Sequence, residues 1–440
     1  MAVQSAWRSE YEKRLTLPEE AVKRLKPGQH LVFPTIAGEP PALVKALGEA
    51  ARAGHVRGVR MSGILPGKYI SSHLLVPELQ DALHWDSFFC GAADRGPVYD
   101  GVYDMTPMHF GQAPMVMRRN MSIDAVMTVV SEPDGEGYVT PSLAVDYTKS
   151  LVETAPYKVA EVNPEVPRVY GDCRLHVSQF DAIVESEDEI MELANPPVTP
   201  EDEVIGRIIA ERIPDGATLQ IGFGGVPSAV AMSLEHHRHL GIHTEMFVDN
   251  TRLLIENGVI DKSRKALHPG KSIYTFCAAS RATYAFLHEN AAIEAYPVDY
   301  TNDPAVIARN NDMFSINATL MIDLTGQACS ESIGERQYSG PGGQLDFVRG
   351  AVGAENGQAF IATYATAKDG AVSRIVDRLP PGAVVTTPRT DIDCVVTEYG
   401  IAELRGRSMR ERAQALIAIA HPDFCDELQR QARARGLGPR

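Results

Sequence analysis

Two short patterns each occur twice in this chain and constrain its fold more than any other feature. Lys26-Pro-Gly-Gln-His-Leu-Val-Phe33 resembles Pro214-Asp-Gly-Ala-Thr-Leu-Gln-Ile221, and the leading glycines are 216 − 28 = 188 residues apart. Asp134-Gly-Glu-Gly137 and Asp323-Leu-Thr-Gly326 are 323 − 134 = 189 residues apart. Two patterns at nearly one offset predict two related halves.

Within each half, strand-like and helix-like stretches alternate. This alternation predicts an α/β fold in which mostly parallel sheets are flanked by helices, with two similar domains. The expected strands are Leu31–Pro34, Val56–Met61, Ala125–Ser131, Tyr157–Val162, Thr218–Ile221, Gly241–Asp249, Ser272–Cys277, Ser315–Asp323, Phe360–Tyr364 and Val395–Thr397. The expected helices are Pro41–Ala53, Glu201–Ile213, Ser228–His239, Ser408–Ala420 and Pro422–Arg433.

An acidic, proline-containing stretch, Glu185–Pro200, is the expected domain boundary. It divides the chain into an N-terminal domain, 1–190, and a C-terminal domain, 200–440. A chain of 440 residues is long enough for two domains with full cores.

Composition excludes several classes of protein. Hydrophobic residues make up 44 % and charged residues 22 %, as in ordinary soluble proteins. A formal net charge of −15 argues against nucleic acid or an anionic membrane as the main partner. No apolar run approaches the roughly 18 residues that a membrane helix needs, and the N-terminus lacks a signal-peptide core. Six scattered cysteines without a C-x-x-C pair predict reduced thiols in a cytoplasmic protein.

The strongest candidate for chemistry is Glu245, within the expected strand Gly241–Asp249. Upstream, a glycine-rich turn, Gly222–Pro227, follows one strand and opens a helix. A carboxylate near such a turn suits a nucleophile beside exposed backbone N–H groups. A solvent-facing glutamate on an edge strand is the alternative, and these residues alone favour it. A second glycine cluster, Ser339–Phe347, adds weight to the first interpretation, because glycine lets a backbone approach a ligand closely.

Other apparent motifs are weaker. Glu235-His-His-Arg-His239 resembles a metal cluster, but adjacent histidines on a helix point in different directions, so a solvated helix end is expected. Gly222-x-Gly224-x-x-Pro227 lacks the third glycine of a dinucleotide site and the Gly-Lys-Ser/Thr of a Walker A loop. We therefore expect no metal site.

Several motifs together resemble the acetyl-CoA hydrolase/transferase family, the class I CoA-transferases that include 4-hydroxybutyrate, butyryl-CoA:acetate, succinyl-CoA:acetate and itaconate CoA-transferases. The resemblance covers most of the chain. In the second half it is carried by Gly241-Ile-His-Thr-Glu-Met-Phe247, Tyr296-Pro-Val-Asp-Tyr-Thr-Asn-Asp-Pro304, Tyr338-Ser-Gly-Pro-Gly-Gly-Gln-Leu-Asp-Phe347, Thr366-Ala-Lys-Asp-Gly370 and Val396-Thr-Glu-Tyr-Gly-Ile-Ala-Glu-Leu-Arg-Gly406. In the first half it is carried by Pro133-Asp-Gly-Glu-Gly-Tyr138 and Ala160-Glu-Val-Asn163.

The resemblance implies two similar α/β domains and ping-pong transfer of coenzyme A through a glutamyl-CoA thioester. Glu245 matches the catalytic glutamate of the family. The residues that match coenzyme-contacting or oxyanion-binding positions are Gly222, Phe223, Gly224, Gly225, Val226, Asn302, Gly340, Gly342, Gly343 and Lys368. Coenzyme A enters as a substrate, with no tightly bound cofactor, and we expect a homo-oligomer.

Two departures from the family pattern bear on the substrate. Val248-Asp-Asn-Thr-Arg252 stands where the family often has Ser-Asp-Gly, and Pro341 interrupts the second glycine cluster. The resemblance therefore leaves the acid open. Three other functions compete: an acyl-CoA hydrolase with the same glutamate, a CoA-binding regulator, and a nicotinamide enzyme. The intact Glu245 and glycine turn argue against the regulator, and the missing third glycine argues against the nicotinamide enzyme.

Overall fold

The structure is a computed structural model that describes residues 2–439. Two compact units are present: unit 1 comprises Met1–Ala194 and Ile273–Thr301, and unit 2 comprises Asn195–Ser272 and Asn302–Arg440. The first change of unit falls inside the stretch expected as a boundary. The segment Ile273–Thr301 belongs to unit 1, although it follows that stretch in the sequence.

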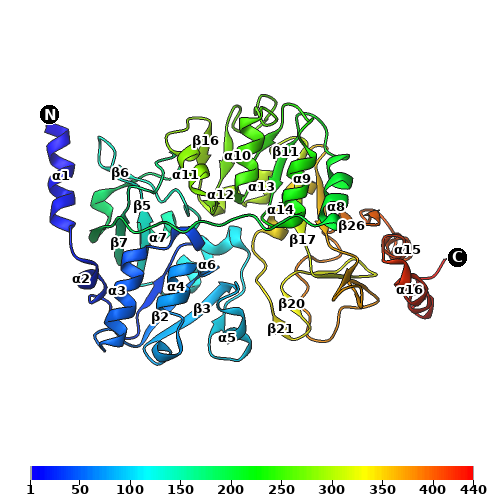
Figure 1. Cartoon of the computed structure of the whole chain (residues 1–440), viewed down its shortest axis with the longest axis horizontal. Coiled ribbons are helices and arrows are strands. Elements are labelled where there is room, and N and C mark those ends of the chain that lie inside the picture. Colours follow the sequence, from blue (N-terminus) through cyan, green and yellow to red (C-terminus); the bar gives the residue numbers. More distant parts are fainter. Residues whose placement is uncertain (1, 440) are drawn as a thin grey trace. The chain divides into compact units, whose positions relative to one another are not determined.

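Unit 1 is built on a seven-stranded parallel sheet with the strand order β10-β7-β5-β1-β2-β3-β4. Its strand at Ala125–Val130 is buried along its whole length and is apolar except for Thr128, which is typical of a parallel sheet covered on both faces. The strands are β1 His30–Val32, β2 Val59–Ile64, β3 Leu83–Phe89, β4 Asp104–Met105, β5 Ala125–Val130, β7 Tyr157–Val162 and β10 Ala182–Glu185. The helices (Figure 1) are α1 Ala2–Arg14, α2 Pro18–Val22, α3 Pro41–Arg52, α4 Lys68–His73, α5 Arg95–Tyr99, α6 Ala113–Asn120, α7 Thr148–Thr154, α11 Arg281–Leu287 and α12 Val298–Thr301.

Unit 2 contains a six-stranded sheet with the order β12-β11-β17-β22-β26-β27, parallel except for β27, which is antiparallel to β26. Its strands are β11 Thr218–Ile221, β12 Gly241–Ile242, β17 Met313–Ala318, β22 Gln358–Ala362, β26 Cys394–Thr397 and β27 Gly400–Glu403. Its helices are α8 Pro200–Ala210, α9 Gly225–Ser233, α10 Asp249–Glu256, α13 Pro304–Ile307, α14 Gln344–Gly353, α15 Met409–Ala418 and α16 Pro422–Ala434. The mostly parallel α/β architecture predicted from the sequence is confirmed.

The two units share one topology. In unit 1, β1 lies between β5 and β2, and α3 connects β1 to β2. In unit 2, β11 lies between β17 and β12, and α9 connects β11 to β12. The pairing registers also correspond, because Val32 lies opposite Val126 in unit 1 and Gln220 lies opposite Ser315 in unit 2.

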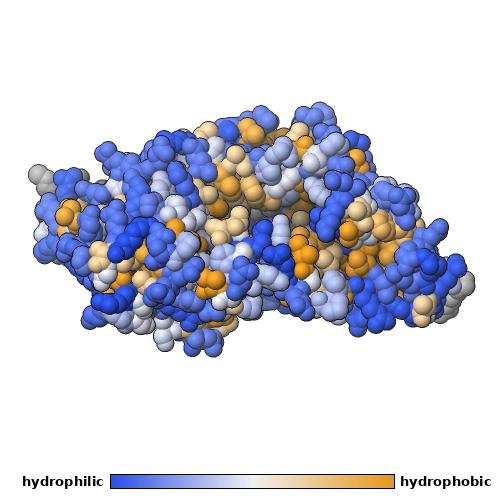
Figure 2. Space-filling view, turned by 60° about the horizontal axis from the view of Figure 1, so that its bottom comes forward, coloured by the Kyte–Doolittle hydropathy of each residue, from blue (hydrophilic) through white to orange (hydrophobic). Residues whose placement is uncertain are grey.

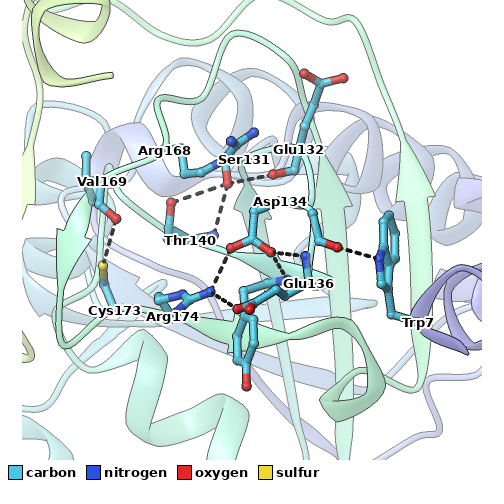
Figure 3. Close-up of polar contacts among 12 residues, drawn as sticks. Trp7, Ser131, Glu132, Asp134, Glu136, Thr140, Arg168, Val169, Cys173 and Arg174 are labelled. Atoms are coloured by element: carbon cyan, nitrogen blue, oxygen red, sulfur yellow. Dashed lines mark hydrogen bonds and ion pairs between the residues drawn. The ribbon is translucent and has the colours of Figure 1, made fainter. Parts of the chain in front are cut away.

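The repeated Asp-x-x-Gly pattern forms the same turn in both units. In unit 1, Asp134 Oδ1 accepts the backbone N–H groups of Glu136 and Tyr138, and Gly137 has φ +87°. Figure 3 shows Arg174 and Trp7 closing around this turn, with Arg174 donating to Asp134 and Trp7 to the Gly135 carbonyl. Burial opposes the charge of Asp134, yet these backbone and arginine hydrogen bonds lower its pKa.

In unit 2, Asp323 Oδ1 accepts the backbone N–H groups of Thr325 and Gln327, and Gly326 has φ +93°. Both glycines occupy the left-handed region that other residues rarely adopt. The Asp-Gly-Glu-Gly motif of unit 1 therefore has a structural role in a turn.

The prediction of one continuous strand over Gly241–Asp249 is wrong. β12 ends at Ile242, a second short strand, β13 Met246–Phe247, follows, and Asp249 begins α10. His243 and Thr244 lie between the two short strands and are both buried. The break leaves Glu245 outside the regular strands.

Other expected elements differ at their ends or are interrupted. Ser315–Asp323 forms two strands, β17 and β18 Met321–Asp323, and Ser272–Cys277 forms β14 Ser272–Tyr274 and β15 Phe276–Cys277. Short apolar runs conceal such breaks, because hydrophobicity alone does not report backbone direction. Helix α9 begins at Gly225, inside the glycine turn, and not at Ser228.

Each sheet lies in an apolar core. In unit 1 this core includes Leu31, Met61, Trp85 and Met127, and in unit 2 it includes Leu219, Ile221, Ile316 and Phe360. The face drawn in Figure 2 is mostly hydrophilic, with hydrophobic side chains in several separate groups. Over residues 2–439, no helix has the length and apolar character needed to cross a bilayer.

Candidate active site

Glu245 lies just beyond the carboxyl end of β12, on the side of the unit 2 sheet where its parallel strands end. Ligands of open α/β sheets bind outside the carboxyl ends of the strands. The two residues before Glu245 are buried, and Glu245 itself is partly exposed. The break between β12 and β13 therefore anchors the backbone and leaves the carboxylate accessible.

The carboxylate of Glu245 has one hydrogen-bond partner among residues 2–439. Asn302 Nδ2 donates to Glu245 Oε2 at 2.6 Å. Asn302 lies in the short connection between α12 and α13 and is fully buried. The other carboxylate oxygen, Oε1, has no partner in the described part of the chain.

Gly343 lies against Glu245 Oε2 and Asn302 Nδ2. It is the N-cap residue of α14, and a Cβ placed on it would lie 1.8 Å from Glu245 Oε2 and 2.2 Å from Asn302 Nδ2. No side chain fits at this position without displacing one of them. The glycine therefore permits the N-terminus of a ten-residue helix to approach the carboxylate directly.

The surroundings of Glu245 shift its ionisation. Burial raises the pKa of the carboxyl group from 4.5 to about 7, the Asn302 hydrogen bond lowers it, and the nearby charge of Asp346 raises it. The positive end of the α14 dipole favours the ionised form. A carboxylate with a pKa near neutrality is ionised in a large fraction of molecules at pH 7 and is poorly solvated, which suits a nucleophile.

The first glycine turn lies beside this group. Gly224 has φ +135° and ψ −180°, a conformation that is essentially restricted to glycine. A Cβ on Gly225 would lie 2.3 Å from Asp202 Oδ2, so the turn packs directly on that carboxylate. Thr244 Oγ1 donates to the Ile221 carbonyl at 3.3 Å, which joins the start of the turn to the residue before Glu245.

Asp202 packs against the first glycine turn, Gly222–Pro227. It is buried in the first turn of α8, where it forms a capping box with Thr199, and Tyr364 Oη donates to its Oδ1 at 2.8 Å. The sequence interpretation did not include Asp202, although Thr199-Pro-Glu-Asp202 is recognisable as a helix start. Its contact with Gly225, across 23 residues of sequence, carried no local signal.

The remaining predicted site residues lie as follows. Gly342 has φ +53°, in the left-handed region, directly before Gly343, and Gly340 opens the same loop. Phe223 is exposed on the glycine turn, whereas Val226 is buried in α9. Lys368 is exposed, with φ +52°, in the hairpin between β23 Thr366–Ala367 and β24 Val372–Ser373. The structure thus brings Glu245, Asn302 and Gly343 into contact.

The histidine-rich segment does not form a metal centre. His237 contacts the Ile213 carbonyl, and His239 pairs with Asp261. In the described range, 2–439, no group of three or more His, Cys, Asp or Glu side chains is arranged to hold a metal ion.

Comparison with known proteins identifies the family. Residues 1–194 match the acetyl-CoA hydrolase/transferase N-terminal domain, and residues 279–432 match its C-terminal domain. Over 433 residues the chain is 43 % identical to the succinyl-CoA:cyclohexane-1-carboxylate CoA transferase of Geobacter metallireducens, covering 97 % of each chain. It is 41 % identical to the 4-hydroxybutyrate coenzyme A transferase of Clostridium kluyveri, covering 98 % of this chain and 99 % of that one.

A solved structure shares the fold over nearly the whole chain. The crystal structure of RipA from Yersinia pestis superposes with a TM-score of 0.93 at 40 % identity, covering 98 % of this chain and 99 % of that chain. The chain therefore belongs to the acetyl-CoA hydrolase/transferase family and is an enzyme of the CoA-transferase group within it.

Proposed function

We propose that this enzyme moves coenzyme A between a short-chain acyl-CoA and a small carboxylate, with Glu245 as the covalent carrier. The acids in question are of the 4-hydroxybutyrate, butyrate, succinate, itaconate or acetate class. The proposal also places the enzyme in the cytoplasm, where its cysteines stay reduced, and as a homo-oligomer.

The first half-reaction begins with attack of Glu245 Oε1 on the thioester carbonyl of the donor. The tetrahedral intermediate collapses with loss of the CoA thiolate, giving an acyl-glutamyl anhydride. The thiolate then attacks the glutamyl carbonyl, the anhydride C–O bond breaks, and the donor acid leaves as a carboxylate. Glu245 is left as a thioester with coenzyme A.

The second half-reaction reverses these steps with another acid. The incoming carboxylate attacks the glutamyl thioester and releases the thiolate, which then attacks the new acyl carbonyl and frees Glu245. Each tetrahedral intermediate on this path carries an oxyanion. Asn302 Nδ2 and the backbone N–H groups at the start of α14 are the donors that stabilise it.

One observation carries the proposal: a partly buried carboxylate has one oxygen held by Asn302 beneath Gly343, and its second oxygen has no partner within residues 2–439. The two buried glutamates of unit 1, Glu39 and Glu161, in contrast, each have both carboxylate oxygens hydrogen-bonded to backbone N–H groups. The family relationship adds that relatives with this chain length are named as CoA-transferases for several different acids.

The test is a panel of acyl-CoA donors against carboxylate acceptors, including cyclohexane-1-carboxylate, with acyl exchange and free CoA followed in parallel. We expect exchange to at least one small carboxylate to exceed free CoA release by a wide margin. Equal CoA release with and without every acceptor would instead identify an acyl-CoA hydrolase, which would use the same glutamate with water as the final acceptor.

A further inference from the structure

A pair of side-chain amides lies beneath the first glycine turn. Gln220, the third residue of β11, is buried, and its Oε1 accepts the Ile316 N–H at 3.2 Å and Asn317 Nδ2 at 3.1 Å. Its Nε2 donates to the Ile316 carbonyl at 3.4 Å. Gln220 therefore holds the Ile316 backbone with both ends of its amide and holds Asn317 through Oε1. Asn317 is half-buried near the carboxyl end of β17.

Asn317 retains unused hydrogen-bonding capacity. Its only side-chain hydrogen bond in the described chain, 2–439, is the one it donates to Gln220. Its carbonyl oxygen and a second N–H remain available to a ligand, since a carboxamide has two donors and an acceptor with two lone pairs.

Unit 1 shows that the sheet does not require this pair. By the matching registers, Val32 of β1 corresponds to Gln220, and Thr128 of β5 corresponds to Asn317. Val32 is fully buried, and the Thr128 hydroxyl donates to the backbone carbonyl of Val129. The same strand arrangement thus forms in unit 1 with valine and threonine at these two positions. The side-chain amides of Gln220 and Asn317 are therefore not required by the fold.

The position of the pair points to a ligand that reaches Glu245. The strands β11 and β17 are neighbours whose chain connections leave in opposite directions, and ligands bind in the crevice at such a switch point. A Cβ on Gly222 would lie 3.9 Å from Gln220 Nε2, so the turn begins directly above the pair. On its other side the turn meets Thr244, the residue before Glu245.

We propose that Asn317 hydrogen-bonds an amide of the pantetheine arm of the acyl-CoA substrate, with Gln220 as its positioning residue. The assignment rests on the proposed function. Of the parts of an acyl-CoA, the nucleotide end is anionic and favours cations, and a short acyl chain is largely apolar. The pantetheine arm is neutral and carries two amides, each with one donor and one acceptor, which a carboxamide complements.

The test compares substrates that keep or lack the arm. The donors are butyryl-CoA, butyryl-pantetheine and the butyryl thioester of methyl 3-mercaptopropionate, which has no amide. In Asn317→Thr, which installs the residue type of unit 1, we expect kcat/KM to fall about 10- to 100-fold for the first two donors, from loss of a hydrogen bond to a desolvated amide. For the third donor we expect a change of less than about twofold.

Asn311→Ala is the matched control. Asn311 is a partly buried asparagine before the opposite, amino end of β17, where it hydrogen-bonds Asp312. It should leave all three donors within about twofold of the wild type. Asn317→Ser serves as a second variant if Asn317→Thr does not fold.

An equal loss for all three donors would overturn the assignment and leave the proposed transfer intact. If the wild-type enzyme transfers no acyl group at all, the proposed function fails instead. In that case calorimetric titration with pantetheine tests only whether Asn317 binds the pantetheine arm. Weaker binding of pantetheine by Asn317→Thr than by the wild type supports the assignment, and unchanged binding overturns it.

Discussion

Three glutamates of this enzyme, two buried and one partly buried, have similarly raised pKa values but differ in the groups that contact them. In unit 1, Glu39 accepts the backbone N–H groups of Gly67, Tyr69 and Ile70, and Glu161 accepts those of Ala42 and Leu43 at the start of α3. In unit 2, Glu245 accepts one hydrogen bond, from Asn302, within residues 2–439. Burial raises the pKa to about 8 for Glu39 and to about 7 for Glu161 and Glu245.

The comparison teaches that a raised pKa does not by itself mark a catalytic carboxylate. Desolvation raises the pKa of all three groups. In Glu39 and Glu161, however, both carboxylate oxygens accept hydrogen bonds from backbone N–H groups, and these bonds hold a loop and the start of a helix in place. Glu245 keeps an oxygen for a substrate. The available atom, more than the ionisation, separates the proposed nucleophile from the structural groups.

The largest effect should come from removing the carboxylate of Glu245. Glu245→Gln keeps the size of the side chain but replaces the nucleophile with an amide, and we expect acyl transfer to fall by at least about four orders of magnitude. Glu161→Gln is the matched control, because it makes the same change at a group with a similar pKa. Its folded fraction should transfer CoA within about threefold of the wild type. Loss of acyl transfer in both folded variants would contradict the distinction between Glu245 as the nucleophile and Glu161 as a structural group.

The next largest effect tests the approach of α14 to Glu245. Gly343→Ala places a methyl group where only 1.8 Å separates the Cβ from Glu245 Oε2, so the carboxylate must move. We expect kcat to fall about 10²-fold, since misplacement of a reacting group by about 1 Å can cost that much. In Gly353→Ala, at the other end of the same helix, the new Cβ meets Ala308 Cβ at 3.4 Å, and activity should be unchanged. A wild-type rate in Gly343→Ala would place the helix terminus outside the reaction.

The two related halves of the chain and the position of Glu245 could be predicted from the sequence, whereas the backbone break beside Glu245 could not. The repeat offset indicated two related halves because the Asp134 and Asp323 turns each need an aspartate and a left-handed glycine at fixed spacing. Glu245 was identified through the family motif. The prediction of one continuous strand around it is wrong, because alternation of residue types along a sequence does not report the backbone break between Ile242 and Met246.

Long-range contacts account for the rest. The support of Gly225 by Asp202 and the hydrogen bond between Gln220 and Asn317 join residues from separate elements. Single residues of ordinary polar type give no local pattern that reports such pairs. The spacing of glycines, in contrast, is local, and for this reason both glycine-rich segments were found.

A smaller effect is expected from the structural carboxylate Glu39. In Glu39→Gln one oxygen becomes an NH₂ group, which cannot accept the backbone N–H that faces it. We expect the free energy of unfolding to fall by about 1–3 kcal/mol, the cost of an unsatisfied buried donor. Urea denaturation measures this loss, and kinetics on the folded variant should show a kcat within about threefold of the wild type. Unchanged stability with a large loss of kcat would make Glu39 catalytic as well.

The smallest effect concerns the pH dependence of stability. The pKa of Glu245 is raised from 4.5 to about 7 on folding, so the folded state binds the proton more tightly, and wild-type stability falls as pH rises through this window. Glu245→Gln lacks this penalty. Its stability relative to the wild type should therefore increase by about 1 kcal/mol between pH 6 and pH 8, as measured by urea denaturation at both values. A difference that is constant with pH would mean that Glu245 has an ordinary pKa.

The most direct test of the central claim asks whether coenzyme A becomes attached to Glu245. The enzyme is incubated with an acyl-CoA donor and no acceptor, and its intact mass is measured before and after borohydride treatment. We predict a covalent CoA adduct that borohydride converts to an alcohol with permanent loss of activity. Peptide mass analysis should place the change within Gly241–Arg252, at Glu245, and Glu245→Gln should give no adduct. An adduct on another residue, or ordinary transfer by Glu245→Gln, would contradict the account.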